Sequence, residues 1–187
     1  MQHRLVPEKW IDNYADYLFS HASYRANNKE QAEDLVQETF LSACKGKDQF
    51  EGNASEKTWL MRILKNKIID LYRKNARERK VITPDADLSY FFDEDQQDHW
   101  TPAAAPKEQT SSALVHLEQK EMSRFIEQCL ALLPPIWHQI SQMKRIDEEK
   151  TDLICKVFDI TASNLWVIMH RTKMQLRDCI EKKSGNG

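Results

Sequence analysis

Apolar side chains recur at helical spacing in three stretches of the N-terminal half. The first stretch predicts a helix over residues 8–25, on which the recurring positions are Trp10, Tyr14, Tyr17, Leu18 and His21. A capping box opens the second stretch, since Asn28 is followed three positions later by Gln31. The apolar stripe of this second helix is predicted to consist of Ala32, Leu35, Val36, Phe40 and Ala43.

The third stretch predicts the longest helix of this half. A polar loop over residues 45–55 precedes it, and Asn53 with Glu56 predicts a second capping box at its start. Three amphipathic helices can close one small core, so residues 1–80 are predicted to form one domain. The buried side of the long helix is predicted to be Trp59, Leu60, Ile63, Leu64, Ile68, Leu71 and Tyr72.

The helical period is lost over residues 81–112, which hold three prolines, an alanine run and a cluster of acids. This composition is typical of a linker. Helical spacing resumes near Leu114 and stops at Pro134-Pro135, because proline lacks a backbone donor. The predicted C-terminal domain, residues 113–187, continues with three helices at 136–143, 148–157 and 161–181. The predicted fold is all-α, with two small helical domains joined by a flexible acidic linker.

Charge is segregated along the chain, although the whole chain carries a net charge of only −2. Residues 57–80 contain nine Lys or Arg and two acids, whereas residues 85–98 contain six acids and no Lys or Arg. A block of positive charge on a helix indicates a polyanionic partner more clearly than the net charge does.

Composition argues against several classes of protein. Only four glycines are present, which disfavours a glycine-rich phosphate loop. No apolar run reaches the roughly 20 residues of a membrane span, and the start MQHRLVPEKW lacks a signal-peptide core, so we expect a cytoplasmic protein without membrane insertion. The four cysteines form no CxxC pair, so we expect packed free thiols and no metal site; they are Cys44, Cys129, Cys155 and Cys179.

Three local patterns carry candidate chemistry. On the long helix, Arg62, Asn66, Ile69, Asp70, Arg73 and Arg77 follow one another at three- and four-residue spacing. Basic groups there can neutralise phosphates, while the Asn66 amide can pair with a base edge and Phe50 in the preceding loop can stack on an exposed base. A solvated charged face is the alternative interpretation.

The second pattern, residues 154–165, predicts a helix-turn-helix, in which Ile154, Val157, Ile160 and Leu165 pack between two helices and Thr161 or Ser163 caps the second. An ordinary helical hairpin is the alternative. The third pattern is a polar stripe with one leucine, which suits a partner surface as well as a solvated face. It consists of Asp34, Gln37, Glu38 and Leu41.

Together these patterns resemble one family. Residues 32–40 (AEDLVQETF), Phe50-Glu51-Gly52, residues 58–60 (TWL) and residues 66–70 resemble conserved region 2 of the extracytoplasmic-function (ECF) sigma factors. Leu132-Leu133-Pro134, the helix-turn-helix and His170-Arg171 resemble region 4 of the same family. Two features depart from it: Asp159 stands where the turn usually has glycine, and the apolar residues 166–168 replace a polar stretch.

The resemblance implies a role for each surface. The stripe on residues 34–41 is implied to grip the clamp helices of the polymerase largest subunit. The −10 element is implied to contact Phe50, Glu51, Gly52, Arg62, Lys65, Asn66, Asp70, Arg73 and Arg77. The −35 element is implied to contact Thr161, Ser163, Asn164, Trp166, Val167, His170, Arg171 and Lys173.

The implied partners are core RNA polymerase, promoter DNA and an anti-sigma protein, often membrane-anchored; no cofactor and no catalysis by the chain itself are implied. The acidic linker is implied to enter the polymerase cleft, with a solubilising tether as the alternative. Two other functions stay open at this point. A stand-alone helix-turn-helix regulator would leave the Phe50 loop unexplained, and an enzyme would need a site that no motif of this sequence supplies.

Overall fold

The computed structural model describes residues 5–78 and 125–183, and within these two ranges every regular element is a helix. The all-α prediction is therefore confirmed. Among these helices none is by itself long and apolar enough to cross a membrane. One bent pair of helices, Thr151–Phe158 with Ala162–Lys183, has the length and composition of a membrane span only when the two are taken together. The predicted linker over residues 81–112 and the predicted helix start near Leu114 lie outside the described residues, so the division into domains at residues 80 and 113 stays a prediction.

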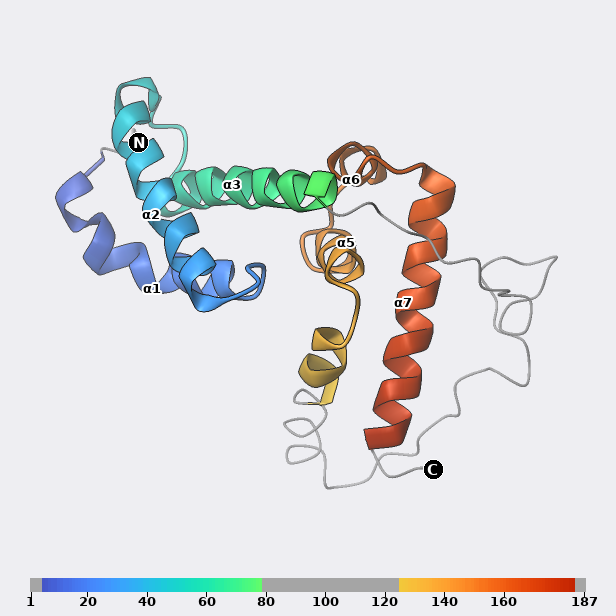
Figure 1. Cartoon of the computed structure of the whole chain (residues 1–187). Helices are drawn as coiled ribbons and strands as arrows, with labels where there is room; N and C mark the ends of the chain where they lie inside the picture. The colour runs from blue at the N-terminus through green and yellow to red at the C-terminus, as the bar shows by residue number, and fades with distance from the viewer. Residues whose placement is uncertain (1–4, 79–124, 184–187) are drawn as a thin grey trace. The chain divides into compact units, whose positions relative to one another are not determined.

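The N-terminal helices, blue to green in Figure 1, are α1 (Trp10–Ser23), α2 (Lys29–Gly46) and α3 (Glu56–Glu78), with short 3₁₀ turns at Pro7–Lys9 and Lys47–Gln49. All three pack against one another around a shared core. That core is made by the predicted apolar faces, because burying them removes apolar area from water. Its fully buried members include Trp10, Leu18, Ala22, Ala32, Ala43, Leu60, Leu64 and Tyr72.

The two predicted capping boxes have different outcomes. At the start of α2, the Asn28 side chain accepts a hydrogen bond from the Gln31 backbone N–H at 2.8 Å, so the predicted N-cap is confirmed. The Gln31 side chain, however, accepts from the Asn27 N–H and not from the Asn28 N–H of a capping box. At α3 the prediction is wrong, because Ser55 caps the helix through the Thr58 N–H at 3.2 Å. Glu56 does not take part in a box since its carboxylate accepts hydrogen bonds from α1, including one from the Trp10 indole at 2.8 Å.

The C-terminal part begins with a helical segment at residues 125–131, followed by α5 (Pro135–Arg145), α6 (Thr151–Phe158) and α7 (Ala162–Lys183). Pro135 is the first residue of α5, so the predicted break at the two prolines is confirmed. The turn between α6 and α7 places Asp159 in the left-handed region, with φ 54° and ψ 51°. Thr161 then caps α7 by accepting a hydrogen bond from the Asn164 N–H at 3.1 Å.

Packing divides the chain into two compact units. The first unit contains α1, α2 and α3 together with α5, α6 and the first turn of α7. The second unit contains segment 125–131 and α7 from Trp166 onward. Contacts of α3 with α5 and α6 therefore belong to the first unit.

The expectation of four free thiols is wrong for two of them. Cys129 in segment 125–131 and Cys179 in α7 form a disulfide, whereas Cys44 and Cys155 are free. The pair is 50 residues apart in sequence. Spacing rules detect close cysteine pairs, and this pair is brought together only by the packing of two helices.

The left-handed residue at the end of α6 gives a test of this turn. Replacing Asp159 with glycine should raise the free energy of unfolding by about 1 kcal/mol, because a side chain in this region is strained. Asp159→Val should lower it by about 1–2 kcal/mol, since a β-branched side chain tolerates positive φ least. Urea unfolding of the full chain measures both. Equal stability of the two variants would show that the turn does not hold this conformation.

Candidate nucleic-acid and polymerase interfaces

One side of α3 is exposed along most of its length. Buried Leu60, Leu64, Ile68 and Tyr72 face the core, whereas the predicted −10 residues on this helix are exposed or half-exposed. The structure therefore brings the predicted residues to one accessible helix side that is rich in Arg and Lys. They are Arg62, Lys65, Asn66, Asp70, Arg73 and Arg77.

The loop before α3 holds Phe50 in a defined place. The Phe50 ring is half-buried, with its centroid 5.2 Å from that of Trp59, whose own ring lies 5.9 Å from Trp10. Gly52 follows with a φ of 74°, which a residue with a side chain adopts only with strain. The loop is thus shaped by glycine and anchored on an aromatic cluster, so Phe50 stands next to the beginning of the basic helix.

The residues of the predicted polymerase-binding stripe all lie on the exposed side of α2. Asp34, Gln37 and Glu38 are exposed, and Leu41 is 61% exposed. Glu38 forms an ion pair with Lys67 of α3 at 3.3 Å. A groove of about 470 Å³ borders the stripe between α1 and α2, lined by Ile11, Phe19, Val36, Gln37 and Phe40 among others.

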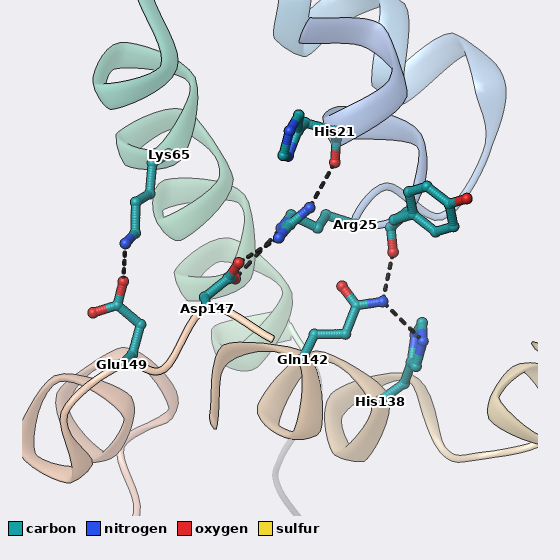
Figure 2. Close-up of polar contacts among 8 residues, drawn as sticks. His21, Arg25, Lys65, His138, Gln142, Asp147 and Glu149 are labelled. Atoms are coloured by element: carbon teal, nitrogen blue, oxygen red, sulfur yellow. Dashed lines mark hydrogen bonds and ion pairs between the residues drawn. The ribbon is translucent and has the colours of Figure 1, made fainter. Parts of the chain in front are cut away.

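A set of polar contacts joins the N-terminal helices to the segment around α5 (Figure 2). Arg25 pairs with Asp147, and both side chains are largely buried, at 10% and 16% exposure. Lys65, one of the predicted −10 residues, pairs with Glu149. An apolar pocket of about 290 Å³ lies between these two ion pairs, and the Ile68, Ile69, Met143 and Ile146 side chains contribute to its lining. Sequence reasoning missed these contacts, since no local pattern links Arg25 to Asp147, 122 positions away, or Lys65 to Glu149, 84 positions away.

Gln142 of α5 lies at the centre of the second part of this network. Its side-chain nitrogen donates to the Tyr24 carbonyl at 2.6 Å and lies 3.0 Å from His138 Nε2 (Figure 2). Because the amide nitrogen can only donate, His138 Nε2 must accept this hydrogen bond. Nε2 therefore carries no proton, and the ring is the neutral imidazole. Burial lowers the pKa of His138, and burial followed by the nearby Arg25 charge lowers the pKa of His21.

The predicted −35 residues divide by exposure. Thr161, Ser163, Asn164 and Lys173 are exposed, and Trp166 and Val167 are half-buried. His170 and Arg171 are 3% and 8% exposed, and the His170 ring lies 3.9 Å from the Trp166 ring. Three of the four exposed candidates therefore cluster at the start of α7, directly after the turn at Asp159.

A polar groove of about 680 Å³ lies between α3 and the α6–α7 turn in the first unit. It is lined by Arg73, Arg77, Lys156, Asp159 and Asn164 among others. The structure thus places two residues predicted for the −10 element in the same groove as one predicted for the −35 element. Within residues 5–78 and 125–183, no group of His, Cys, Asp and Glu is arranged to hold a metal ion.

Comparison with known proteins identifies related sequences over nearly the whole chain. Residues 10–78 match the family model of sigma-70 region 2. A "Probable RNA polymerase sigma factor" of Haemophilus influenzae is 35% identical over 170 residues, covering 89% of this chain and 85% of that protein. The ECF RNA polymerase sigma factor SigX of Bacillus subtilis is 33% identical over 118 residues, covering 63% of this chain and 56% of that protein.

A solved structure of the sigma factor RpoE in complex with the anti-sigma factor NepR, from Bartonella quintana, covers 93% of this chain and 96% of that chain. Its sequence identity is 19% and its TM-score is 0.43, which is too weak a likeness to support a conclusion.

The two neutral histidines predict a pH dependence of stability. Since folding lowers both pKa values below the ordinary 6.5, the unfolded chain binds more protons in that range. Their contribution to the free energy of unfolding is complete above about pH 6.5 and is lost as the pH falls below it. Arg25 and Lys57 oppose protonation of His21, whereas Asp147 favours it.

Urea titrations of the full chain between pH 7.5 and 5.5 measure this effect. The double variant His21→Gln, His138→Gln should lose stability less steeply as the pH falls, because it lacks both titrating groups. Parallel pH profiles for the variant and the parent chain would contradict the assignment.

Proposed function

Since this chain belongs to the RNA polymerase sigma factors of the ECF type, we propose that it holds the two promoter elements on two separate surfaces. The −10 element would lie on α3 and the Phe50 loop, and the −35 element on the turn and first part of α7. The observation that carries the proposal is the exposed side of α3. It combines basic side chains with one amide, next to an aromatic ring held in a fixed loop.

On α3 the side chains divide into two tasks. Arg62, Lys65, Arg73 and Arg77 suit phosphate contacts, which position a strand without reading its sequence. Asn66 is the exposed amide on this side, and an amide can donate to and accept from one base edge at once. Phe50 supplies a stacking surface for an unpaired base, with Glu51 and Gly52 shaping the loop.

The stripe on α2 suits a docking surface for core RNA polymerase. Asp34, Gln37 and Glu38 offer polar groups around the exposed Leu41, and an exposed large apolar side chain ringed by polar groups is typical of a protein contact. Polymerase carries the bond-making chemistry in this proposal. The chain would act in the cytoplasm, where polymerase works, and an anti-sigma protein would compete for these surfaces.

At the other surface, Thr161, Ser163 and Asn164 occupy the exposed start of α7. In helix-turn-helix proteins the N-terminal residues of the second helix contact base edges in the major groove. Lys173, nine residues after Asn164, suits a phosphate contact. The other predicted −35 residues are less accessible. Trp166 and Val167 are half-buried and suit contact with a thymine methyl. His170 and Arg171 are buried and would need greater exposure to contact DNA.

Promoter binding also requires the contact between α3 and the α5–α6 segment to open. The −10 and −35 elements are about 25 base pairs apart, which is roughly 85 Å along B-form DNA. Arg73 and Asn164 line one groove of about 680 Å³, so they cannot contact both elements in this arrangement. Lys65 is likewise held by Glu149 instead of a phosphate. We therefore assign the described arrangement to the chain before it meets polymerase.

Transcription in vitro tests the proposed function. The purified chain with core RNA polymerase should start RNA synthesis at a defined position on promoters that core enzyme alone does not use. A stand-alone regulator would instead bind free duplex DNA without polymerase. Absence of affinity for core enzyme, or binding without any choice of start site, would overturn the proposal.

Asn66 provides a sharp test of the −10 surface. Asn66→Ala should reduce promoter opening about 5- to 100-fold, because a bidentate base contact contributes about 1–3 kcal/mol. Permanganate footprinting of the melted strand measures opening, and a titration with core polymerase should show unchanged affinity.

Asn13→Ala, an exposed asparagine on α1, is the matched control and should leave opening unchanged. Equal opening by the Asn66 variant and the parent chain would remove Asn66 from the interface. Phe50→Ala needs a parallel stability measurement, since the ring also packs on Trp59.

If the contact between α3 and the α5–α6 segment must open before the chain binds polymerase, weakening that contact should speed assembly with polymerase. Replacing Asp147 and Glu149 with alanine removes both ion pairs to the N-terminal helices and raises the population of the open chain. Stopped-flow fluorescence should then show association with core enzyme several-fold faster.

The pair Glu127→Ala, Asp152→Ala removes the same charge from exposed positions outside the contact and controls for electrostatics. If both double variants associate at one rate, the contact does not limit assembly.

A further inference from the structure

The disulfide between Cys129 and Cys179 joins the two helices of the second unit. Its Cα atoms are 5.8 Å apart, within the usual range for a disulfide. The same two helices also meet through Lys183, whose Nζ donates to Gln128 Oε1 at 2.7 Å. This second contact does not involve sulfur and lies at the surface, since both of its side chains are exposed; it joins the same two helices, which are drawn in Figure 1.

The two sulfurs differ in their access to solvent. Cys129 is 2% exposed, whereas Cys179 is half-exposed. A dissolved oxidant or reductant therefore reaches Cys179 first. Disulfides in the cytoplasm are usually transient, catalytic or redox-sensing. A sigma factor works beside cytoplasmic polymerase, so this step of the inference rests on the proposed function.

We propose that Cys129 and Cys179 form a reversible redox site that sets the stability of the unit carrying most of α7. A peroxide is the proposed oxidant. The Cys179 thiolate attacks one peroxide oxygen to give a sulfenic acid and, after protonation, water or an alcohol. The Cys129 thiol then attacks the Cys179 sulfur, the S–S bond forms, and the hydroxyl leaves as water.

Reduction follows the opposite order with a cellular dithiol. Its thiolate attacks the half-exposed Cys179 sulfur, and Cys129 leaves as a thiolate that takes up a proton. The second thiol of the reductant then breaks the mixed disulfide and releases Cys179. The dithiol is oxidised to its own disulfide, so electrons and protons balance.

The bond acts on stability without covering the DNA-reading surface. Cys179 lies 16 residues after Ser163, which is about 24 Å along a helix. The bond closes a loop of 50 residues that contains α5, α6 and most of α7. Closing this loop lowers the conformational entropy of the unfolded chain, which raises the free energy of unfolding. The oxidised chain should therefore hold α7 in place at temperatures at which the reduced chain loses it.

Thiol trapping and thermal melting of the full chain test the redox site. Hydrogen peroxide should protect Cys129 and Cys179 from alkylation, and reduced thioredoxin should restore both. The oxidised chain should melt about 10 °C or more above the reduced chain. Cys129→Ala and Cys179→Ala should abolish this difference, whereas the double variant Cys44→Ser, Cys155→Ser should keep it.

Transcription by holoenzyme tests the consequence. It is measured at the temperature where half of the reduced chain has lost the second unit. There, oxidised chain should give about twice as much product as reduced chain, because only half of the reduced molecules keep α7 folded. Cys129→Ala should give the reduced level with or without peroxide.

Each failure has a separate meaning. If peroxide leaves both thiols alkylatable, if thioredoxin never reopens the bond, or if both redox states transcribe and melt alike, the redox site is overturned and the sigma function stands. If the bond cycles and shifts the melting temperature but neither redox state directs polymerase, the proposed function fails and only the redox chemistry of the site remains.

Discussion

The helix α3 is longer than the bundle that covers it, and this constraint organises the first unit. Its 23 residues span about 35 Å, and its apolar face runs from Leu60 to Tyr72. α1 and α2 bury the first part of that face. Tyr72 is covered with the help of Phe158 from α6, whose ring centroid lies 6.1 Å away. The side of α3 that none of the described helices covers carries charged groups.

A single carboxylate fixes how the bundle meets the start of α3. Glu56 accepts hydrogen bonds from the Trp10 indole and from the Tyr14 hydroxyl, at 2.8 and 3.3 Å. Because these donors lie on α1, the beginning of α3 and the loop before it are held against that helix. The position of Phe50 therefore depends on contacts that do not involve nucleic acid, and the loop is shaped before any strand arrives.

Local pattern was sufficient to predict much of this fold. Spacing of apolar residues predicts the helices and the core members Leu60, Leu64 and Ile68, because a half-buried helix must repeat every 3.6 residues. The cap at Asn28 and the break at Pro135 follow from the chemistry of those residues. Exposure of Asn66 follows from the same period, since it lies opposite the buried face.

Contacts between distant residues could not be predicted in this way. Arg25 and Asp147 are 122 residues apart, and nothing near either residue marks the other as its partner. The disulfide between Cys129 and Cys179 was missed for the same reason. Helix packing brings the two cysteines together, and a rule based on their spacing in sequence does not detect it. The capping box at Asn53 failed because Glu56 finds donors on another helix, which a local pattern ignores.

The aromatic cluster at the loop has a spectroscopic consequence. Indole emission is sensitive to neighbouring rings and to solvent, and the Trp59 centroid lies 5.2 Å from the Phe50 ring. Any ligand that displaces or covers Phe50 changes the surroundings of Trp59 while Trp10 remains buried against Glu56. The protein thus carries an intrinsic optical probe at the point where an unpaired base would enter.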